Sequence, residues 1–159
     1  MPQNLNQSAI FVPPADHAAA RCVSPERLLA LRRTALEVMD LLAGSHLSLR
    51  CYLSGSVAEG NADEYADINI QVFADSAKEV EIFLLDCGLR CCHETPKSHL
   101  AEAVIVLEPG IADVNLVIYP ANLERMQLPT RDGQPRPRLK PLALRRLIEA
   151  DTSTSGDDA

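Results

Sequence analysis

Apolar residues recur at helical spacing in the first third of the chain. They begin just after Ser24-Pro25 and follow every three or four residues up to Gly44, at Leu28, Leu31, Ala35, Val38, Met39 and Leu42. Serine caps helix N-termini, proline suits the first helical position, and glycine commonly ends helices. The pattern therefore predicts a helix that begins at Pro25 and ends near Gly44.

Strict alternation of apolar and polar residues predicts a strand from Asp67 to Phe73. One face of this strand carries Ile68, Ile70 and Val72, and the other face carries Asp67, Asn69 and Gln71. Strands are also predicted at 47–53, 101–107 and 111–119. The turn at Glu108-Pro109-Gly110 joins the last two into an antiparallel hairpin.

Two further helices complete the pattern. One is predicted over Ser76–Cys87, closed by Gly88, and the other over Pro141–Ala150. The order of helices and strands predicts an α+β fold, and 159 residues suit one domain. We expect an N-terminal arm at 1–23, the domain at 24–150, and a disordered acidic tail at 151–159.

Composition narrows the class of protein. With 47% hydrophobic and 23% charged residues, the chain is typical of globular proteins. No apolar run approaches the roughly 20 residues of a membrane helix, and the N-terminus lacks a signal-peptide pattern. The five cysteines include the adjacent pair Cys91-Cys92 and make a poor disulfide framework, so we expect a cytoplasmic protein without a membrane partner.

A zinc site is the alternative for the segment from Cys87 to His99, which holds three cysteines and two histidines. No Cys-x-x-Cys pair recurs there at zinc-finger spacing. We therefore interpret the group as buried thiols and surface histidines.

The net charge of −7 is the sum of opposite blocks. Residues 51–120 carry 12 acidic and 3 basic residues, whereas residues 121–150 carry 7 basic and 3 acidic ones. The overall acidity argues against a general nucleic-acid coat. The basic block leaves contact with RNA, a nucleotide or an acidic partner open, although few aromatic residues lie near it for base stacking, so RNA is not favoured. Its basic residues are Arg125, Arg131, Arg136, Arg138, Lys140, Arg145 and Arg146.

A Gly-Ser turn and an acidic strand start form the candidate site. Gly55 has no Cβ and lets backbone approach a ligand closely, while Ser56 offers a hydroxyl and an N–H to a phosphate, particularly if a short helix starts there. Asp67 and residue 69 share one strand face, where two acids would hold divalent cations. Arg50, Arg90, Lys97 and His99 are candidate phosphate partners.

These motifs resemble the minimal nucleotidyltransferase family of the DNA polymerase β superfamily. The family signature is Gly-Ser, about ten residues with a glycine, and then Asp-hydrophobic-Asp-hydrophobic. This chain has Gly55-Ser56, ten intervening residues that include Gly60, and then Asp67-Ile68-Asn69-Ile70. The family's third acid lies on a later strand between hydrophobic residues, as Asp113 does. The resemblance implies a polymerase β-like fold with a small mixed β-sheet and flanking helices.

The resemblance also implies an activity. Family members transfer a nucleotidyl group from a Mg²⁺-bound nucleoside triphosphate, here ATP or CTP, to a hydroxyl on a protein, an RNA or a small molecule. It gives Asp67 and Asp113 catalytic roles, and assigns nucleotide binding to Gly55, Ser56 and Asn69. Asp67, Asn69 and Asp113 fall at its metal-ligand positions. Many small members are antitoxins that modify a toxin, so a protein partner of that kind is expected.

Asn69 departs from the family pattern, which has Asp at this position. Asparagine is neutral and offers one carbonyl oxygen, whereas hard cations prefer carboxylate oxygens. Two main hypotheses therefore stay open: an active nucleotidyltransferase, or a catalytically degenerate fold that serves as a nucleotide-binding or protein-interaction regulatory module. A third, weaker hypothesis is a structural α+β protein without nucleotide chemistry. The acidity around Asp67 favours metal dependence in either of the first two cases, because a bare acidic site repels a triphosphate.

Overall fold

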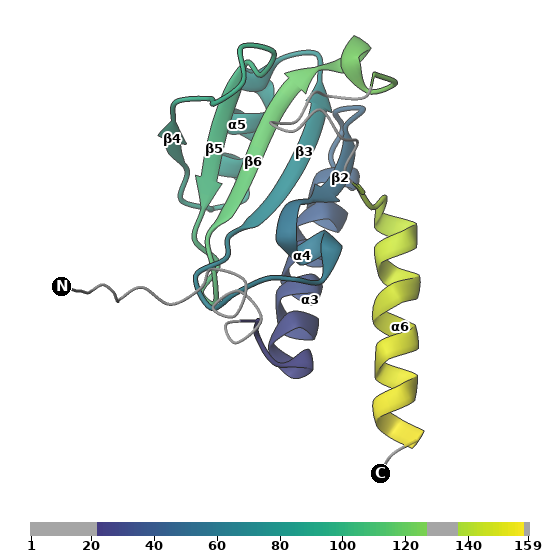
Figure 1. Ribbon diagram of the computed structural model, residues 1–159. Helices are drawn as coiled ribbons and strands as arrows, with labels where there is room; N and C mark the ends of the chain where they lie inside the picture. Colours follow the sequence, from purple (N-terminus) through teal and green to yellow (C-terminus); the bar gives the residue numbers. More distant parts are fainter. Residues whose placement is uncertain (1–21, 127–136, 158–159) are drawn as a thin grey trace, which may run out of the picture.

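A computed structural model describes residues 22–126 and 137–157, with side chains described through residue 152 (Figure 1). The helices and strands of the described residues, labelled as in Figure 1, are α3 (Pro25–Ala43), β2 (Arg50–Ser54), α4 (Gly55–Glu59), β3 (Ile68–Ala74), α5 (Ala77–Asp86), β4 (Cys92–Glu94), β5 (Ala103–Leu107), β6 (Val114–Pro120), the 3-10 turn η1 (Ala121–Leu123) and α6 (Pro141–Asp157).

The strands form one sheet in the order β2-β3-β6-β5-β4. β3 and β6 are parallel, and the other neighbouring strands are antiparallel. Helices α3, α5 and α6 contribute side chains to a core on one face of this sheet, and no helix of the described residues covers the opposite face (Figure 1). The predicted α+β fold with a small mixed sheet and flanking helices is confirmed.

The alternation predicted for β3 decides which side chains enter the core. Ile68, Ile70 and Val72 are fully buried against the helices, and Asn69 and Gln71 lie half-buried on the opposite face. The helix predicted at Pro25 begins there, because the Ser24 hydroxyl accepts a hydrogen bond from the backbone N–H of Arg27. The hairpin prediction is also confirmed, since β5 and β6 pair antiparallel.

A second, smaller cluster lies on the face without helices. Phe73 is fully buried there, stacked on Tyr119 at a ring distance of 5.5 Å and edge-on to Tyr52 at 5.8 Å. The guanidinium of Arg138 covers the Tyr52 ring at 4.1 Å from its centre. Aromatic and cation–π contacts therefore stabilise the end of this face that lies away from Asp67.

Several features of the structure differ from the expectations drawn from the sequence. The strand expected at 47–53 begins only at Arg50, because the Ser45 hydroxyl bonds the carbonyls of Leu42 and Leu47 and holds a turn there. β4 was not predicted, since its three residues are all exposed and show no apolar alternation. The thiols expected to be buried include Cys87 and Cys92, which are exposed, whereas His93 and His99 lie at the surface as predicted.

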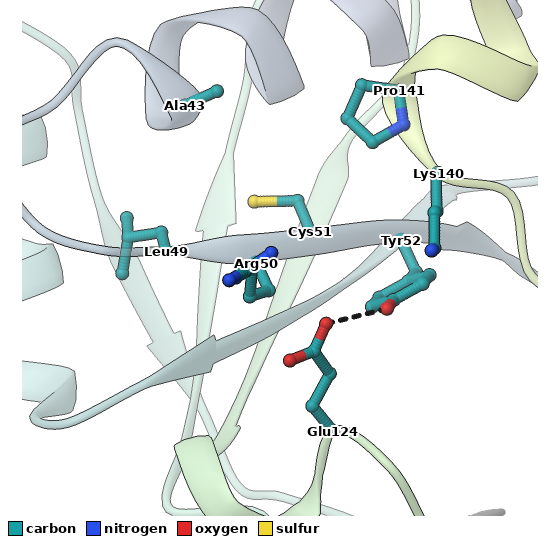
Figure 2. A pocket seen from close by; sticks show the side chains of 8 residues that line it. All are labelled: Ala43, Leu49, Arg50, Cys51, Tyr52, Glu124, Lys140 and Pro141. Atoms are coloured by element: carbon teal, nitrogen blue, oxygen red, sulfur yellow. Dashed lines mark hydrogen bonds between the residues drawn. The ribbon is translucent and has the colours of Figure 1, made fainter.

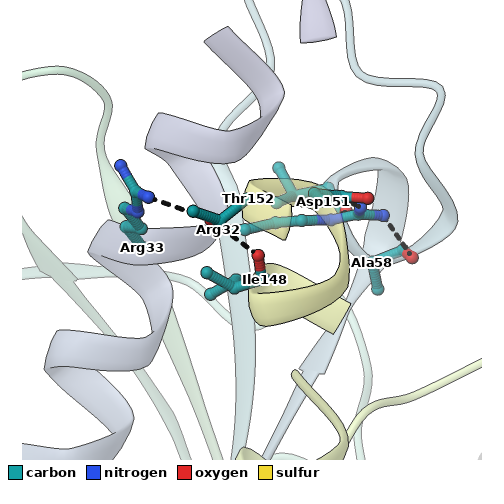
Figure 3. A network of polar contacts seen from close by, with 7 residues as sticks. Arg32, Arg33, Ala58, Ile148, Asp151 and Thr152 are labelled. Carbon is teal, nitrogen blue, oxygen red and sulfur yellow. Dashed lines mark hydrogen bonds and ion pairs between the residues drawn. The ribbon is translucent and has the colours of Figure 1, made fainter. Parts of the chain in front are cut away.

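The last helix continues past its predicted end at Ala150 to Asp157, into the segment expected to be a disordered tail. Contacts with α3 explain the added length (Figure 3). Asp151 forms an ion pair with Arg32 at 3.7 Å, and Thr152 accepts a hydrogen bond from Arg33 at 3.1 Å. Residues 1–21 of the predicted arm lie outside the described residues, while Val23 donates a backbone hydrogen bond to Ala62.

No helix of the described residues is both long and apolar enough to cross a membrane. Burial raises the pKa of the Cys51 thiol, which lies on β2 facing the core, to about 12. This thiol therefore stays protonated across the physiological pH range.

Arg32 joins three helices from inside the protein. It is only 6% exposed, and it is the one buried charged residue among those that the structure describes. Its Nε donates to the carbonyl of Val57 at 3.0 Å and its Nη2 to that of Ala58 at 3.2 Å, both in α4, while Asp151 lies on α6 (Figure 3). Desolvation by burial lowers the pKa of Arg32, and Asp151 opposes that effect. Arg32 thus ties the short helix after the Gly-Ser turn to both long helices.

We expect Arg32→Met to lower the free energy of unfolding by about 3 kcal/mol, because two buried carbonyls lose their donor. Arg33→Met is the matched control: Arg33 is the exposed neighbour, and its loss should cost below about 1 kcal/mol. Urea unfolding followed by circular dichroism measures both values. Equal losses for the two variants would contradict a special role of Arg32.

Candidate functional site

Gly55 and Ser56 directly follow β2 and are the first two residues of the short helix α4. Gly55 has a φ of +77°, in the left-handed region that favours glycine. A Cβ at Gly55 would lie 3.1 Å from the Nδ2 atom of Asn69. The backbone conformation therefore favours glycine here, and a larger residue would also press against the Asn69 side chain.

The parallel pairing of β3 with β6 brings the polar residues of the two strands together. Asn69 is the register partner of Asn115, and the backbone N–H of Ile68 donates to the carbonyl of Asp113 at 2.9 Å. Asp67 and Asp113, both exposed, therefore precede adjacent strands at the same end of the sheet.

The Asn115 amide connects the other two polar side chains. Its Nδ2 donates to Oδ2 of Asp67 and to Oδ1 of Asn69, each at 3.2 Å. An amide nitrogen has two hydrogens, so these bonds use both of them. The Asp67 carboxylate and the Asn69 carbonyl are thus held together by a neutral donor.

A cavity of about 230 Å³ opens beside these three residues, on the sheet face without helices. Asp67, Asn69 and Asn115 line it at the strand starts. Its other lining residues come from β4, the segment after it, β5 and β6: Glu94, Thr95, Lys97, Ser98, Val104, Val117 and Tyr119. Most of the lining residues are therefore polar, and Val104, Val117 and Tyr119 add apolar surface.

The predicted site residues are only partly brought together. Asp67 and Asn69 line the cavity, and Gly55 contacts Asn69. Ser56, half-buried in the first turn of α4, and the exposed Asp113 are not among the lining residues.

The four candidate phosphate partners do not lie in one place. Lys97 lines the cavity beside Asp67, whereas Arg50 lines two other hollows. Arg90 and His99 line none of these.

Sequence reasoning missed Glu94, Thr95, Ser98 and Tyr119. Glu94 reaches the site because it pairs with Val104 across the edge of the sheet. The three-residue strand that carries it has no pattern from which the pairing could be predicted. The hydrogen bonds of Asn115 to Asp67 and Asn69 depend on the register between β6 and β3, which no local pattern in the sequence specifies.

The side chains present do not fit a pair of metal ions. Within residues 22–126 and 137–152, no group of three or more His, Cys, Asp or Glu side chains could hold a metal ion. A second cation near Asn69 would also meet the positive hydrogens of the Asn115 amide, which already occupy the Asn69 and Asp67 oxygens. Of the three residues that line the cavity at the strand starts, Asp67, Asn69 and Asn115, only Asp67 carries a carboxylate.

Comparisons with known proteins give similarity at the level of the fold. No family model matches the chain, and no curated protein matches it. One similar solved structure is a cytoplasmic RNA terminal U-transferase, with 15% identity and a TM-score of 0.48 over 65% of this chain and 32% of that chain. A structure of Cid1, described with RNA terminal uridylyl transferase activity, has 16% identity and a TM-score of 0.49 over 65% and 34%.

The GLD-2/RNP-8 complex has 12% identity and a TM-score of 0.47 over 71% of this chain and 48% of that chain. This chain thus spans about a third to a half of the length of these proteins. At such scores the similarity carries no conclusion about reaction or substrate.

The Gly55 geometry gives a test with a matched control. Gly88 has a similar φ of +83° but open space where a Cβ would be, so Gly88→Ala measures the backbone cost alone, about 1 kcal/mol. Gly55→Ala should cost clearly more in urea unfolding, because the added methyl group displaces Asn69. The side-chain amide signals of Asn69 and Asn115 should shift in the NMR spectrum of this variant only. Equal costs and unchanged amide signals would refute the contact.

Proposed function

We propose that the chain is a nucleoside-triphosphate-binding module, built on a polymerase β-like nucleotidyltransferase fold, with little or no transfer activity. The observation that carries this proposal is the Asn115 amide, which bonds both Asp67 and Asn69 at 3.2 Å. The family that the chain resembles has a second aspartate at the position of Asn69, where this chain has a neutral, hydrogen-bonded amide.

The lining of the cavity supports a nucleotide as ligand. Val104, Val117 and Tyr119 offer an apolar wall for a base, and the hydroxyls of Thr95 and Ser98 offer hydrogen bonds. Such a wall with a few converging polar groups is typical of small-molecule sites. ATP and CTP are the nucleotides that the family resemblance favours.

Charge supports binding of the nucleotide together with its own Mg²⁺. Two carboxylates, those of Asp67 and Glu94, line the cavity together with one cation, Lys97. A bare triphosphate would be repelled by the two carboxylates, whereas its magnesium complex presents a cation to Asp67.

Weak or absent turnover follows from the same residues. Two-ion phosphoryl chemistry needs carboxylates that bridge two cations and stabilise the attacking and leaving oxygens. Asn69 supplies no charge for such a bridge, and its oxygen already accepts a hydrogen bond from Asn115. Binding without transfer would suit a regulatory role toward a protein partner.

Nucleotidyl transfer to a hydroxyl of a protein, an RNA or a small molecule is the second candidate. One observation favours it: Asp67 and Asp113 precede adjacent parallel strands, so two of the family's three carboxylate positions lie at one end of the sheet. In this hypothesis the acceptor would include a toxin-like protein.

Binding is tested by calorimetry of the full chain with MgATP and with MgCTP. We expect Asp67→Asn to weaken binding about tenfold or more, because the nucleotide's magnesium loses its carboxylate. Glu64→Gln is the control, since it removes the charge of an exposed acid outside the cavity. Chelation of magnesium should weaken binding to the wild-type chain. Equal affinities for Asp67→Asn and Glu64→Gln would exclude this cavity as the nucleotide site.

Turnover is tested with Asn69→Asp. A second carboxylate beside Asp67 should make the melting temperature respond to MgCl₂ alone, and should increase pyrophosphate release from ATP or CTP. Gln71→Glu is the control, because it adds an acid to the same face of β3 but outside the cavity lining. Pyrophosphate release by the wild-type chain equal to that of Asn69→Asp would favour the second candidate.

A further inference from the structure

Basic residues from three separate segments meet at the free edge of β2. Leu139 and Leu53 exchange two backbone hydrogen bonds of 2.8 Å, which fix the segment before α6 along this edge. Together with the residues that follow η1, this pairing forms a cavity of about 690 Å³. Its lining residues are Arg50, Tyr52, Glu124, Arg125, Arg138, Lys140 and Ala143. Figure 2 shows the adjoining hollow, which shares Arg50, Tyr52, Glu124 and Lys140 with it.

Glu124 is the one acidic residue among the described residues that line this cavity, and it already accepts hydrogen bonds within the protein. Glu124 accepts a hydrogen bond of 2.7 Å from the Tyr52 hydroxyl (Figure 2), and its backbone carbonyl accepts one of 2.6 Å from Arg138. Burial, the Glu124 hydrogen bond and the Glu124 charge raise the pKa of Tyr52, so the hydroxyl remains a donor. Arg138 also bonds Gln71 and covers the Tyr52 ring, so its position is fixed.

The other three cations have unused donors. Arg50, Arg125 and Lys140 are exposed, and none of them forms a hydrogen bond or an ion pair with a residue that the structure describes. Three such cations around a hollow repel one another and attract anions from solution.

The start of α6 adds backbone donors to the same hollow. The helix begins at Pro141, and Lys140 and Ala143 from its start line the cavity. The N–H groups of Leu142 and Ala143 have no acceptor within the helix, and the positive end of the helix dipole lies there. The N-terminal end of α6 therefore lies beside the side-chain donors of this cavity.

We propose that this cavity is a phosphate-binding site, separate from the nucleotide cavity and sharing no lining residue with it. Arg and Lys side chains beside helix N–H groups are suited to the oxygens of a phosphomonoester or phosphodiester. Arg50 pairs with Phe73, and Asn69 lies four residues earlier on β3, so about 13 Å along the strand separates the two sites. The site does not depend on the proposed nucleotide binding.

The test is an NMR titration of the full chain with inorganic phosphate. Backbone amides of Lys140 and Ala143 should shift and saturate. In Arg125→Gln/Lys140→Gln the dissociation constant should rise about tenfold or more, because two charge-assisted contacts are lost. Arg146→Gln is the matched control: it removes a charge from the same basic block, at an exposed position outside the cavity, and should change affinity less than about twofold. Circular dichroism checks the fold, and Arg125→Gln alone replaces the double variant if the latter unfolds.

Oligonucleotides with and without a 5′-phosphate distinguish the source of the phosphate. Tighter binding of the phosphorylated one supports a monoester ligand, and equal binding of both supports a diester backbone. The proposal would be overturned if Arg146→Gln weakened phosphate binding as much as the double variant does. It would also be overturned if the NMR shifts were confined to the cavity beside Asp67, or if an aspartate-rich peptide bound more tightly than phosphate. Asp67→Asn should leave phosphate binding unchanged, so failure of one proposal does not imply failure of the other.

Discussion

The parallel pairing of β3 with β6 is the constraint on which the candidate site depends. It places Asn69 beside Asn115 and Asp67 beside Asp113, although 46 residues separate the paired positions. Because side chains alternate along each strand, the same pairing sends Ile68 and Val114 into the core. A one-residue shift of this register would bury the polar residues and expose the apolar ones, so core packing and site geometry are specified together.

At the centre of the site, the neutral amide of Asn115 links two oxygen-bearing side chains. Two carboxylates side by side repel each other unless a cation or a proton lies between them. Asn115 joins Asp67 to Asn69 without either, and Gly55 lies against the other side of Asn69. Arg32 in turn donates hydrogen bonds to the Val57 and Ala58 carbonyls of α4, the helix that begins at Gly55. Contacts within the protein therefore connect Asp67, Asn69 and α4.

The face without helices has two different regions. At the strand starts it carries the polar cavity, and toward the other end Phe73, Tyr52 and Tyr119 pack together under Arg138. Arg138 is also the residue next to Leu139, whose pairing with Leu53 brings the basic segment to the edge of the sheet. Residues 138–140 thus cover the aromatic cluster and also line one side of the basic cavity.

The motif spacing in the sequence singled out Gly55, Asp67 and Asn69 as candidate site residues. The sequence by itself determined the local features: the α3 start at Pro25, the faces of β3 and the β5–β6 hairpin. Each of these follows from short-range physics, namely capping, alternation and glycine's freedom at positive φ. Only the tertiary structure decided that Asn115 joins Asp67 and Asn69, that Glu94 and Lys97 complete the cavity, and that Arg50 meets Arg125 and Lys140. Those contacts depend on strand register and edge pairing between distant segments, and no local pattern in the sequence specifies them.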